Sequence, residues 1–482
     1  MAMDSEGDVY DVIVIGAGPV GENVADRTQA AGLSTVIVEA ELVGGECSYW
    51  ACMPSKALLR PAAALADARR VAGAREAVSG ALDAAAVLAR RNSFTSDWKD
   101  DGQVGWLDSV GVPLVRGHAR LQGPRRVVVS TPSGEERELT ARHVVAVCTG
   151  TQAQVPGDLP GLAGARVWTS REATSAQQVP GRLTVVGGGV VAVEMAAAWQ
   201  ALGSQVTLLV RGDALLGRME SFAGELVADG LREAGVQVRF GVSVTALERG
   251  EQEGAPVTAV LGDGQRLESD EILFAVGRVP ATADLGLETV GLKPGSWLEV
   301  DDSCLVRDVD GDWLYAVGDV NQRSLLTHQG KYQARIAGAV IGARAHGERA
   351  EPTAWSPFAA TADELAVPQV VFTDPEAASV GLTAAQAEAA GHRVRAVDYD
   401  MGGVAGASLY ADGYTGRARM VVDLDREVLL GVTFVGPGVA ELLHSATVAV
   451  VGEVPIARLW HAVPSYPTIS EIWLRLLETY RG

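Results

Sequence analysis

A chain of 482 residues is too long for one hydrophobic core, so two to four domains are expected. The net charge of -20 argues against nucleic acid as a partner, and no apolar run approaches the roughly 18 residues of a membrane span. The acidic N-terminus lacks a signal-peptide pattern and four cysteines are too few for a secreted disulfide framework, so a cytoplasmic protein is expected.

The first pattern in the chain is a dinucleotide-binding unit. Residues 11–15 form an apolar, β-branched run typical of a buried strand, and the helical segment after it ends at Gly32. A second strand at 34–38 closes on Glu39. The glycines of the fingerprint stand between the first strand and the helix, at Gly16, Gly18 and Gly21. They permit a tight turn and close approach of a pyrophosphate, while the acid accepts a hydrogen bond from a ribose hydroxyl.

A pair of cysteines follows this unit. Cys47 and Cys52 lie five positions apart, and Pro54 and Ser55 predict the start of a helix that continues to residue 70. A helix N-terminus stabilises a thiolate, and Cys52 lies nearer to that end. No His or further Cys flanks the pair, so no metal site is expected. The pair is interpreted as redox-active, the alternative being two buried and inert thiols.

The next segments predict helices and then strands. Residues 73–110 are Ala-rich and helical in pattern, whereas residues 112–149 predict short strands with a turn at 131–134. Cys148 lies in the last of these strands, and Cys304 stands alone further on. Both are expected to be structural residues of the core.

The fingerprint then recurs. Residues 183–186 and 205–210 predict two strands around a helix, and the glycine positions hold Gly187, Gly189 and Ala192. The second strand ends on Arg211 instead of an acid, with Arg218 a few residues on. Because Arg pairs with a 2′-phosphate that an acid would repel, NADPH is favoured over NADH. The alternative for Arg211 is a solvated residue at a strand end.

The last third of the chain adds a strand and a separate domain. The strand at 313–319 closes on Gly318 and Asp319, where the acid could meet a flavin ribityl chain or phosphate. Residues 351–358 predict a linker. Beyond it an α+β domain is expected, with strands at 369–373, 394–397, 418–422 and 429–435 and helices at 440–451 and 471–478.

These motifs together resemble the pyridine nucleotide–disulfide oxidoreductases, the family of dihydrolipoamide dehydrogenase, glutathione reductase and mercuric reductase. The resemblance covers nearly the whole chain, with its motifs in the same order. It rests on Gly16-x-Gly18-x-x-Gly21, Cys47-x4-Cys52 with Pro54-Ser55-Lys56, Gly187-x-Gly189-x-x-Ala192 with Val193-Glu194, Tyr315-Ala316-x-Gly318-Asp319, and the stretch from Thr373-Asp374-Pro375-Glu376 to Leu382.

The resemblance implies an α/β homodimer with two Rossmann-like dinucleotide-binding domains and a C-terminal α+β dimerisation domain. The implied FAD-binding domain has two parts, at 1–156 and 281–350. The NAD(P)-binding domain spans 157–280 and the dimerisation domain spans 351–482.

The resemblance also implies an electron path and a set of site residues. The reduced nicotinamide passes hydride to FAD, the flavin reduces a Cys47–Cys52 disulfide, and Cys47 attacks a small-molecule acceptor while Cys52 faces the flavin. Lys56 lies near the flavin and pairs with Glu194. The implied cofactor-binding residues are Gly16, Gly18, Gly21, Glu39, Gly45, Lys56, Thr149, Gly150, Gly187, Gly189, Ala192, Arg211, Gly277, Gly318 and Asp319.

One position departs from the family's pattern. Its disulfide reductases carry a catalytic His directly before Pro-Thr, with a Glu five residues later, whereas this chain has Tyr466 there and keeps Glu471. Imidazole titrates near neutral pH, but a phenol with a pKa of about 10 is a poor base at pH 7. Three interpretations stay open: Tyr466 is a modified acid in a disulfide reductase, the acceptor needs no such base, or a local shift brings His461 into the site.

The acceptor therefore stays open. Tyr49 and Trp50 stand between the cysteines, where they either shape an unusual pocket or pack. The expected function is a flavoprotein oxidoreductase that passes electrons from NAD(P)H through FAD and Cys47–Cys52 to a disulfide or another small acceptor. The alternatives are a mercuric or quinone-type reductase without a disulfide substrate, and a dihydrolipoamide dehydrogenase-like component of a multienzyme complex.

Overall fold

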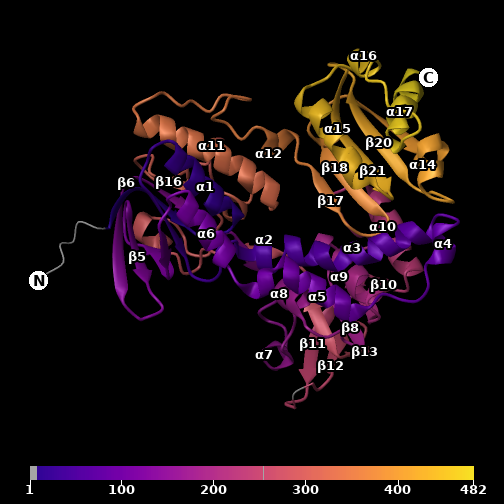
Figure 1. Cartoon of the computed structure of the whole chain (residues 1–482), viewed down its shortest axis with the longest axis horizontal. Coiled ribbons are helices and arrows are strands. Elements are labelled where there is room, and N and C mark those ends of the chain that lie inside the picture. The colour runs from indigo at the N-terminus through magenta and orange to yellow at the C-terminus, as the bar shows by residue number, and fades with distance from the viewer. Residues whose placement is uncertain (1–7, 253) are drawn as a thin grey trace, which may run out of the picture. The chain divides into compact units, whose positions relative to one another are not determined.

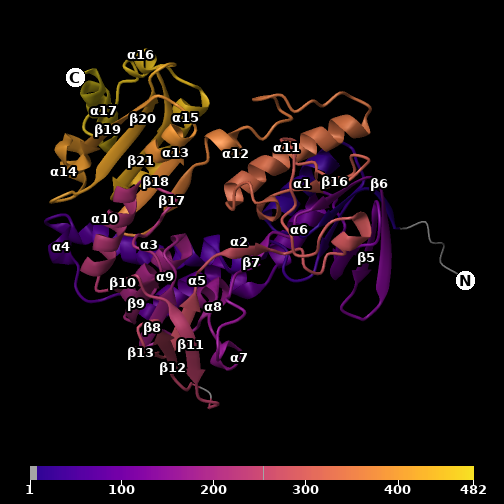
Figure 2. The same ribbon diagram turned by 180° about the vertical axis from the view of Figure 1, so that it is seen from behind.

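The computed structural model describes residues 8–252 and 254–482, and the chain divides into two compact units (Figures 1 and 2). The first unit contains the residues up to Met53 together with Asn92–Ala153 and Arg278–Asp363. The second contains Pro54–Arg91, Gln154–Gly277 and Glu364–Gly482. Among the helices of the described ranges, none is long and apolar enough to cross a bilayer. The finer division into FAD-binding, NAD(P)-binding and dimerisation segments stays a prediction.

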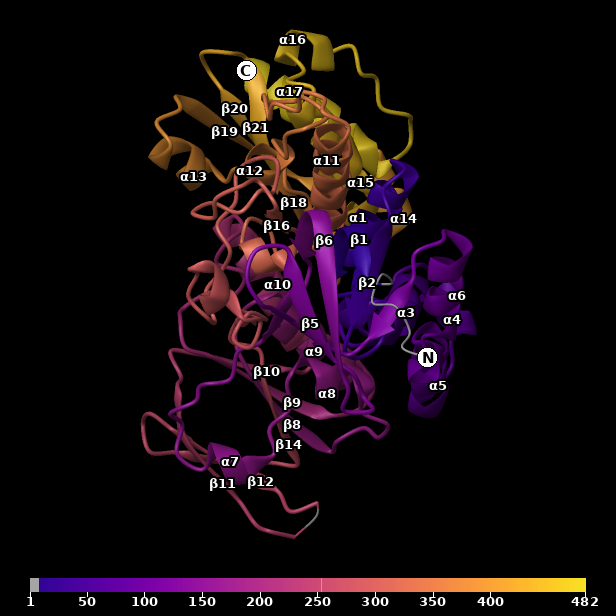
Figure 3. The ribbon, with the colours of Figure 1, turned by 90° about the vertical axis from the view of Figure 1, so that its left-hand side faces the viewer.

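A seven-stranded sheet forms the centre of the first unit. Its order is β3-β2-β1-β6-β5-β4, and β16 also pairs with β6. The strands are β1 (Val9–Ile15), β2 (Thr35–Glu39), β3 (Leu114–Arg116), β4 (His118–Leu121), β5 (Arg126–Ser130), β6 (Glu136–Val147) and β16 (Leu314–Ala316). The strands β1, β2, β3, β6 and β16 pair in parallel, whereas β5 and β6 form the long antiparallel hairpin seen in Figure 3.

Two long helices lie side by side on this sheet, α1 (Pro19–Ala30) and α11 (Thr327–Ala345) (Figure 1). Their close approach depends on Gly338, since a Cβ there would lie 2.5 Å from the Cβ of Arg27. The connection between β2 and β3 includes the short helices α2 (Gly45–Tyr49) and α6 (Asp101–Ser109). The helix α3 (Cys52–Arg69) starts in the first unit and continues into the second.

The second unit contains three sheets. A parallel sheet of order β10-β9-β8-β14 comprises β10 (Gln237–Phe240), β9 (Gln205–Val210), β8 (Arg182–Val186) and β14 (Glu271–Phe274). A three-stranded antiparallel sheet comprises β11 (Val244–Arg249), β12 (Val257–Leu261) and β13 (Arg266–Ser269). A five-stranded antiparallel sheet comprises β17 (Gln369–Val371), β18 (Glu376–Gly381), β21 (Val428–Gly436), β20 (Arg417–Asp423) and β19 (Val394–Asp400).

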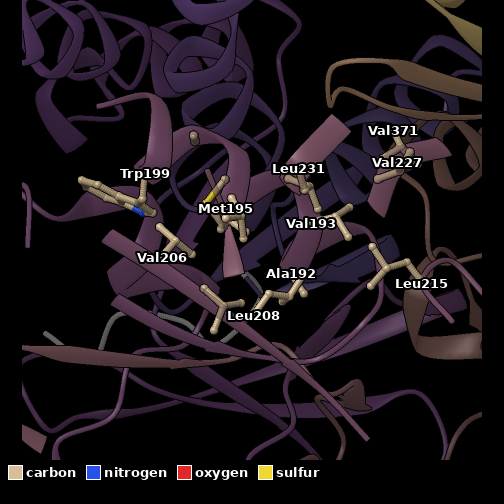
Figure 4. Close-up of a cluster of buried hydrophobic side chains, with 14 of the residues drawn as sticks. Ala192, Val193, Met195, Trp199, Val206, Leu208, Leu215, Val227, Leu231 and Val371 are labelled. Atoms are coloured by element: carbon tan, nitrogen blue, oxygen red, sulfur yellow. The ribbon is translucent and has the colours of Figure 1, made fainter. Parts of the chain in front are cut away.

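One hydrophobic cluster joins the parallel sheet of this unit to the five-stranded sheet. The helix α9 (Val190–Ala201) contributes Val193, Met195 and Trp199, and Val371 of β17 belongs to the same cluster (Figure 4). Helix α10 (Ser221–Glu233) adds Val227 and Leu231. The helices α15 (Val439–Val451) and α17 (Ile472–Arg481) complete the C-terminal part.

Most predicted elements are confirmed, and the differences have local causes. The helix after the cysteines begins at Cys52, two residues before the predicted Pro54 start. Pro54 is tolerated as its third residue because the first helical N–H groups have no acceptor within the helix. Helix α2 was not predicted, since five residues are too few to show a helical period. Strand β18 was also missed, because its Ala and Ser residues give no strand signal.

Candidate functional site

The first glycine motif forms a tight turn between β1 and α1. Gly16 has φ +98°, and a Cβ on Gly21 would lie 1.9 Å from the Gly16 carbonyl oxygen, so neither position accepts a larger residue. A Cβ on Gly18 would meet nothing within 4 Å, which leaves this side of the turn open. Gly18 is also the N-cap of α1 and provides no side-chain cap. The exposed N–H groups of this helix terminus suit a phosphate.

Polar groups from neighbouring strands gather at the same edge of the sheet. Glu39 ends β2 and accepts a hydrogen bond of 2.7 Å from the Ala17 N–H, and burial raises the pKa of its carboxyl. Thr149 follows β6, and its buried Oγ1 has no hydrogen-bond partner among the described residues. Gly150 takes φ +67° in the same turn. An orphaned hydroxyl, an uncapped helix terminus and a buried acid fit the phosphates and ribose of a dinucleotide.

The turn after β16 faces this edge as well, because β16 pairs with β6. Gly318 has φ +86° and ψ −154°, a conformation that only glycine adopts readily. The Asp319 carboxylate accepts a hydrogen bond of 3.1 Å from the Thr151 hydroxyl, which also accepts from Arg278 Nε at 2.5 Å. Burial raises the pKa of Asp319, and the charge of Arg278 opposes that shift.

The two cysteines lie on successive helices, Cys47 within α2 and Cys52 as the first residue of α3. Both thiols are half-buried in the structure. A hydrogen bond to Cys52 and burial raise the pKa of the Cys47 thiol, while the Thr327 hydroxyl and the charge of Lys331 lower it. The sulfur of Cys52 lies 3.2 Å from Thr327 Oγ1, at the first residue of α11. The two thiols are close enough to form a hydrogen bond, which suits reversible disulfide formation next to a helix N-terminus.

The aromatic residues between the cysteines differ in their surroundings. Tyr49 is 1% exposed, and its hydroxyl donates to the Val43 carbonyl at 3.0 Å. Its own carbonyl accepts from Trp98 Nε1 at 3.2 Å. Trp50 is half-buried, with its ring centroid 5.7 Å from that of Tyr49. Tyr49 is therefore a packing residue, and only Trp50 is exposed enough to line a pocket.

Lys56 and Glu194 are brought together in the second unit. Lys56 Nζ donates to Glu194 Oε2 at 2.8 Å, and the other carboxylate oxygen accepts from the Phe372 N–H at 3.0 Å. Lys56 Nζ also lies 5.0 Å from the centroid of the Phe372 ring. The side chain of Glu194 is 3% exposed, so its charge depends on Lys56 and the backbone for compensation.

The second glycine motif has the geometry of the first. Gly187 has φ +141°, a Cβ there would lie 2.2 Å from the Ala275 carbonyl oxygen, and a Cβ on Gly189 would meet nothing within 4 Å. Arg211 follows β9 and is exposed, as is Arg218, and neither forms an ion pair within the described ranges. Gly277 has φ +148° at the end of this unit.

The C-terminal residues singled out from the sequence are exposed or tied to the backbone. The side chain of Tyr466 is 77% exposed, and His461 is exposed as well. Glu471 Oε2 accepts a hydrogen bond of 2.9 Å from the Gly406 N–H. The Glu therefore holds a backbone turn, and no hydrogen bond joins it to an imidazole among the described residues.

Several polar residues at these turns gave no signal in the sequence. Thr327 and Lys331 belong to the first turns of α11. Glu22 lies in the first turn of α1, and its buried Oε1 has no hydrogen-bond partner in the part of the chain that the structure describes. Burial raises the pKa of Glu22 to about 7. Arg278 is 3.9 Å from Glu46, the residue before Cys47. The residues in these contacts lie far apart in the sequence, so local patterns do not predict the contacts. They form only when β1, β6 and β16 pair.

The chain was also compared with known proteins. The family model described as pyridine nucleotide-disulphide oxidoreductase matches residues 10–337, and the model of the family's dimerisation domain matches residues 367–476. Dihydrolipoyl dehydrogenase of Thermus scotoductus is 33% identical over 472 residues, covering 96% of this chain and 95% of the relative. Mercuric reductase of Staphylococcus aureus is 29% identical over 464 residues, covering 96% and 81%.

A solved structure with the same fold is a Cu(II) complex of the HOCl-induced flavoprotein disulfide reductase RclA from Escherichia coli. It has a TM-score of 0.82 at 22% identity and covers 98% of this chain and 99% of RclA. The expected family and α/β fold class are confirmed by these matches. The chain belongs to the pyridine nucleotide–disulphide oxidoreductases and is an FAD-dependent enzyme of that family with a C-terminal dimerisation domain.

Proposed function

We propose that this protein is an NADPH-dependent flavoprotein reductase that passes electrons through Cys47 and Cys52 to a small acceptor other than a disulfide. The observation that carries the choice of acceptor is the exposed Tyr466 at the position where the family's disulfide reductases have a catalytic His. A phenol does not accept a proton readily near pH 7, so it is poorly suited to shuttle the proton that a leaving thiolate takes up. Metal ions and quinones need no such leaving group.

The first unit would hold FAD. The open turn at Gly18, the uncapped α1 terminus and the orphaned Thr149 hydroxyl support this assignment, with Glu39 for a ribose and Asp319 at the opposite turn. When bound, FAD supplies a group that accepts a hydride and donates the same two electrons to a disulfide. Gly16, Gly21, Gly45, Gly150 and Gly318 would allow the backbone to approach it.

The second unit would bind the nicotinamide cofactor at Gly187, Gly189 and Ala192, with Gly277 beside it. Arg211 and Arg218 are exposed and make no ion pair within the described ranges, so both are available for a 2′-phosphate. This supports NADPH over NADH. In R211E the preference should turn towards NADH, because the new acid repels the phosphate and accepts from a ribose hydroxyl. The ratio of kcat/KM for the two cofactors measures it, and an unchanged ratio would contradict the assignment.

The two thiols would have different tasks. Cys52, at the start of α3 and within hydrogen-bond distance of Thr327, is the candidate for the flavin-facing thiolate. Cys47 would then be the thiol that meets the acceptor. Lys56 and Glu194 would act as a polarising pair, a role that their 2.8 Å contact supports.

An acceptor panel tests the proposal. The purified enzyme is supplied with NADPH and, in turn, lipoamide, glutathione disulfide, a benzoquinone, mercuric ion and Cu(II), the last because the RclA structure is a Cu(II) complex. Turnover with quinone or metal ions is expected to exceed turnover with either disulfide by about a hundredfold, the usual contribution of a general acid–base. Strong lipoamide turnover would overturn the choice of acceptor.

A second candidate is a dihydrolipoamide dehydrogenase-like component of a multienzyme complex. The relative from Thermus scotoductus carries the name dihydrolipoyl dehydrogenase, and this favours the candidate. In that case Tyr466 would serve as a modified acid. Replacing it by Phe should then abolish lipoamide turnover and leave quinone turnover intact.

The proposal includes a homodimer in the cytoplasm. The match to the family's dimerisation domain supports the dimer, as do exposed apolar side chains in the same segment, among them Leu409, Val448 and Val463. The free, buried thiols of Cys148 and Cys304 suit a reducing compartment.

A further inference from the structure

The first unit contains a buried chain of polar side chains that the proposed electron path does not use. Gln333 of α11 is 0% exposed, and its Oε1 accepts two hydrogen bonds of 2.8 Å, from the Gly318 N–H and from Asn321 Nδ2. Its Nε2 donates to Asp363 Oδ2, also at 2.8 Å. The amide of Gln333 thus links the turn after β16 to Asp363.

Asp363 fixes which way this amide points. Its side chain is fully buried, and its other oxygen accepts from Gln329 Nε2 at 2.9 Å. Arg323 Nε lies 3.5 Å from Oδ2 and compensates the charge. A carboxylate only accepts hydrogen bonds, so Gln333 must present its NH₂ to Asp363 and its carbonyl oxygen to the turn.

The turn itself depends on that oxygen. Gly318 is buried in a conformation that only glycine adopts readily, and its N–H would be an unsatisfied buried donor without Gln333. The second donor, Asn321 Nδ2, also donates to the Ala316 carbonyl at 3.0 Å and so ties the end of β16 to the same acceptor. Asp319 stands between these anchored residues.

We propose that Asp363 and Gln333 are positioning residues for flavin binding: Asp363 orients the Gln333 amide, and that amide holds the Gly318–Asp319 turn in its binding conformation. This inference rests on the proposed assignment of FAD to the first unit. Neither residue needs to touch the cofactor. The affinity for FAD then depends on which of the two side chains donates the hydrogen bond between them, and not only on how they pack.

Exchanging the amide of Gln333 and the carboxylate of Asp363, singly and together, tests whether the direction of their hydrogen bond matters. In Q333E the new carboxylate still accepts from Gly318 and Asn321 but faces the carboxylate of Asp363. In D363N the amide offers one acceptor oxygen to two glutamine donors. In the double variant, Q333E with D363N, the amide at 363 donates to the carboxylate at 333 and accepts from Gln329, so every hydrogen bond between these side chains and the turn is kept and only the one between positions 333 and 363 changes direction.

The measurement is the Kd of FAD for flavin-stripped protein, from the quenching of flavin fluorescence, together with the melting temperature of the stripped protein. Each single variant should weaken FAD binding about tenfold or more, the effect of one unsatisfied buried group, and the double variant should return to within about threefold of wild type. D302N is the matched control. It removes the other carboxylate partner of Arg323, whose Nη2 lies 2.9 Å from Asp302 Oδ1, and should leave the Kd unchanged.

Unchanged affinity in both single variants would overturn the proposal, as would additive losses in the double variant. If the single variants do not fold, a folded double variant with wild-type affinity supports the proposal, and an unfolded one contradicts it. Wild-type protein that binds no FAD would instead refute the proposed function, so the two failures are distinguishable.

Discussion

At the scale of single residues, the pKa of the Cys47 thiol is set by its burial and by groups from two other helices, α3 and α11. Its hydrogen bond to Cys52 and its burial raise its pKa, whereas Thr327 and Lys331 of α11 lower it. Lys331 follows Thr327 by one helical turn, so both side chains project from the same face of α11. Since the thiolate is the nucleophile, the positive charge of Lys331 favours the reactive form of Cys47, against the larger effects of Cys52 and burial.

Replacing Lys331 by Gln should make Cys47 less reactive. Loss of the positive charge raises the thiol pKa, so less thiolate is present at any pH below it. The test uses a C52S background, so that Cys47 is the thiol that reacts, since Cys148 and Cys304 are buried. There K331Q should lower the rate of iodoacetamide alkylation at pH 8 about three- to tenfold and move the pH profile of that rate to higher pH. R335Q, on the same helix, is the control, and an unmoved profile in K331Q would contradict the role of Lys331.

At the scale of elements, the sequence predicted most of what supports the site. The glycine fingerprints, the strand ends at Glu39 and Arg211 and the Lys56–Glu194 contact follow from local patterns or from the family resemblance. The sequence did not reveal that Gln333 and Asp363 hold the Gly318 turn, because this contact depends on tertiary packing. Nor did it reveal that Tyr49 is buried, because an aromatic residue looks the same in a pocket and in a core.

Helix α9 offers a stability test. Trp199 is fully buried in the cluster of Figure 4, and its Nε1 has no hydrogen-bond partner among the described residues. Replacing it by Ala should lower the free energy of unfolding by about 3–5 kcal/mol, because a large cavity forms under the parallel sheet. W199F is the matched control and should retain most of the stability. Urea unfolding followed by circular dichroism gives both values, and equal losses in the two variants would contradict the cavity as the cause.

At the scale of the whole molecule, the dimerisation segment is the part that can be tested separately from the chemistry. Val448 of α15 is 55% exposed and lies in the segment matched to the family's dimerisation domain. V448D should shift the protein from dimer to monomer, because a charge in an apolar interface loses its hydration. Light scattering after gel filtration measures the mass. V71D, at a residue with 37% exposure outside that segment, should stay dimeric.

In the proposed function, electrons leave the flavin through Cys47 and Cys52. Anaerobic titration with NADPH tests it directly, because a flavin and a disulfide each accept two electrons. Wild-type protein should consume about two NADPH per flavin. The C47S variant should show the yellow spectrum of bound oxidised flavin before NADPH is added, consume about one NADPH per flavin as that flavin is bleached, and fail to reduce the preferred acceptor. If C47S still consumed two NADPH per flavin, or reduced that acceptor at the wild-type rate, the cysteine path would be wrong.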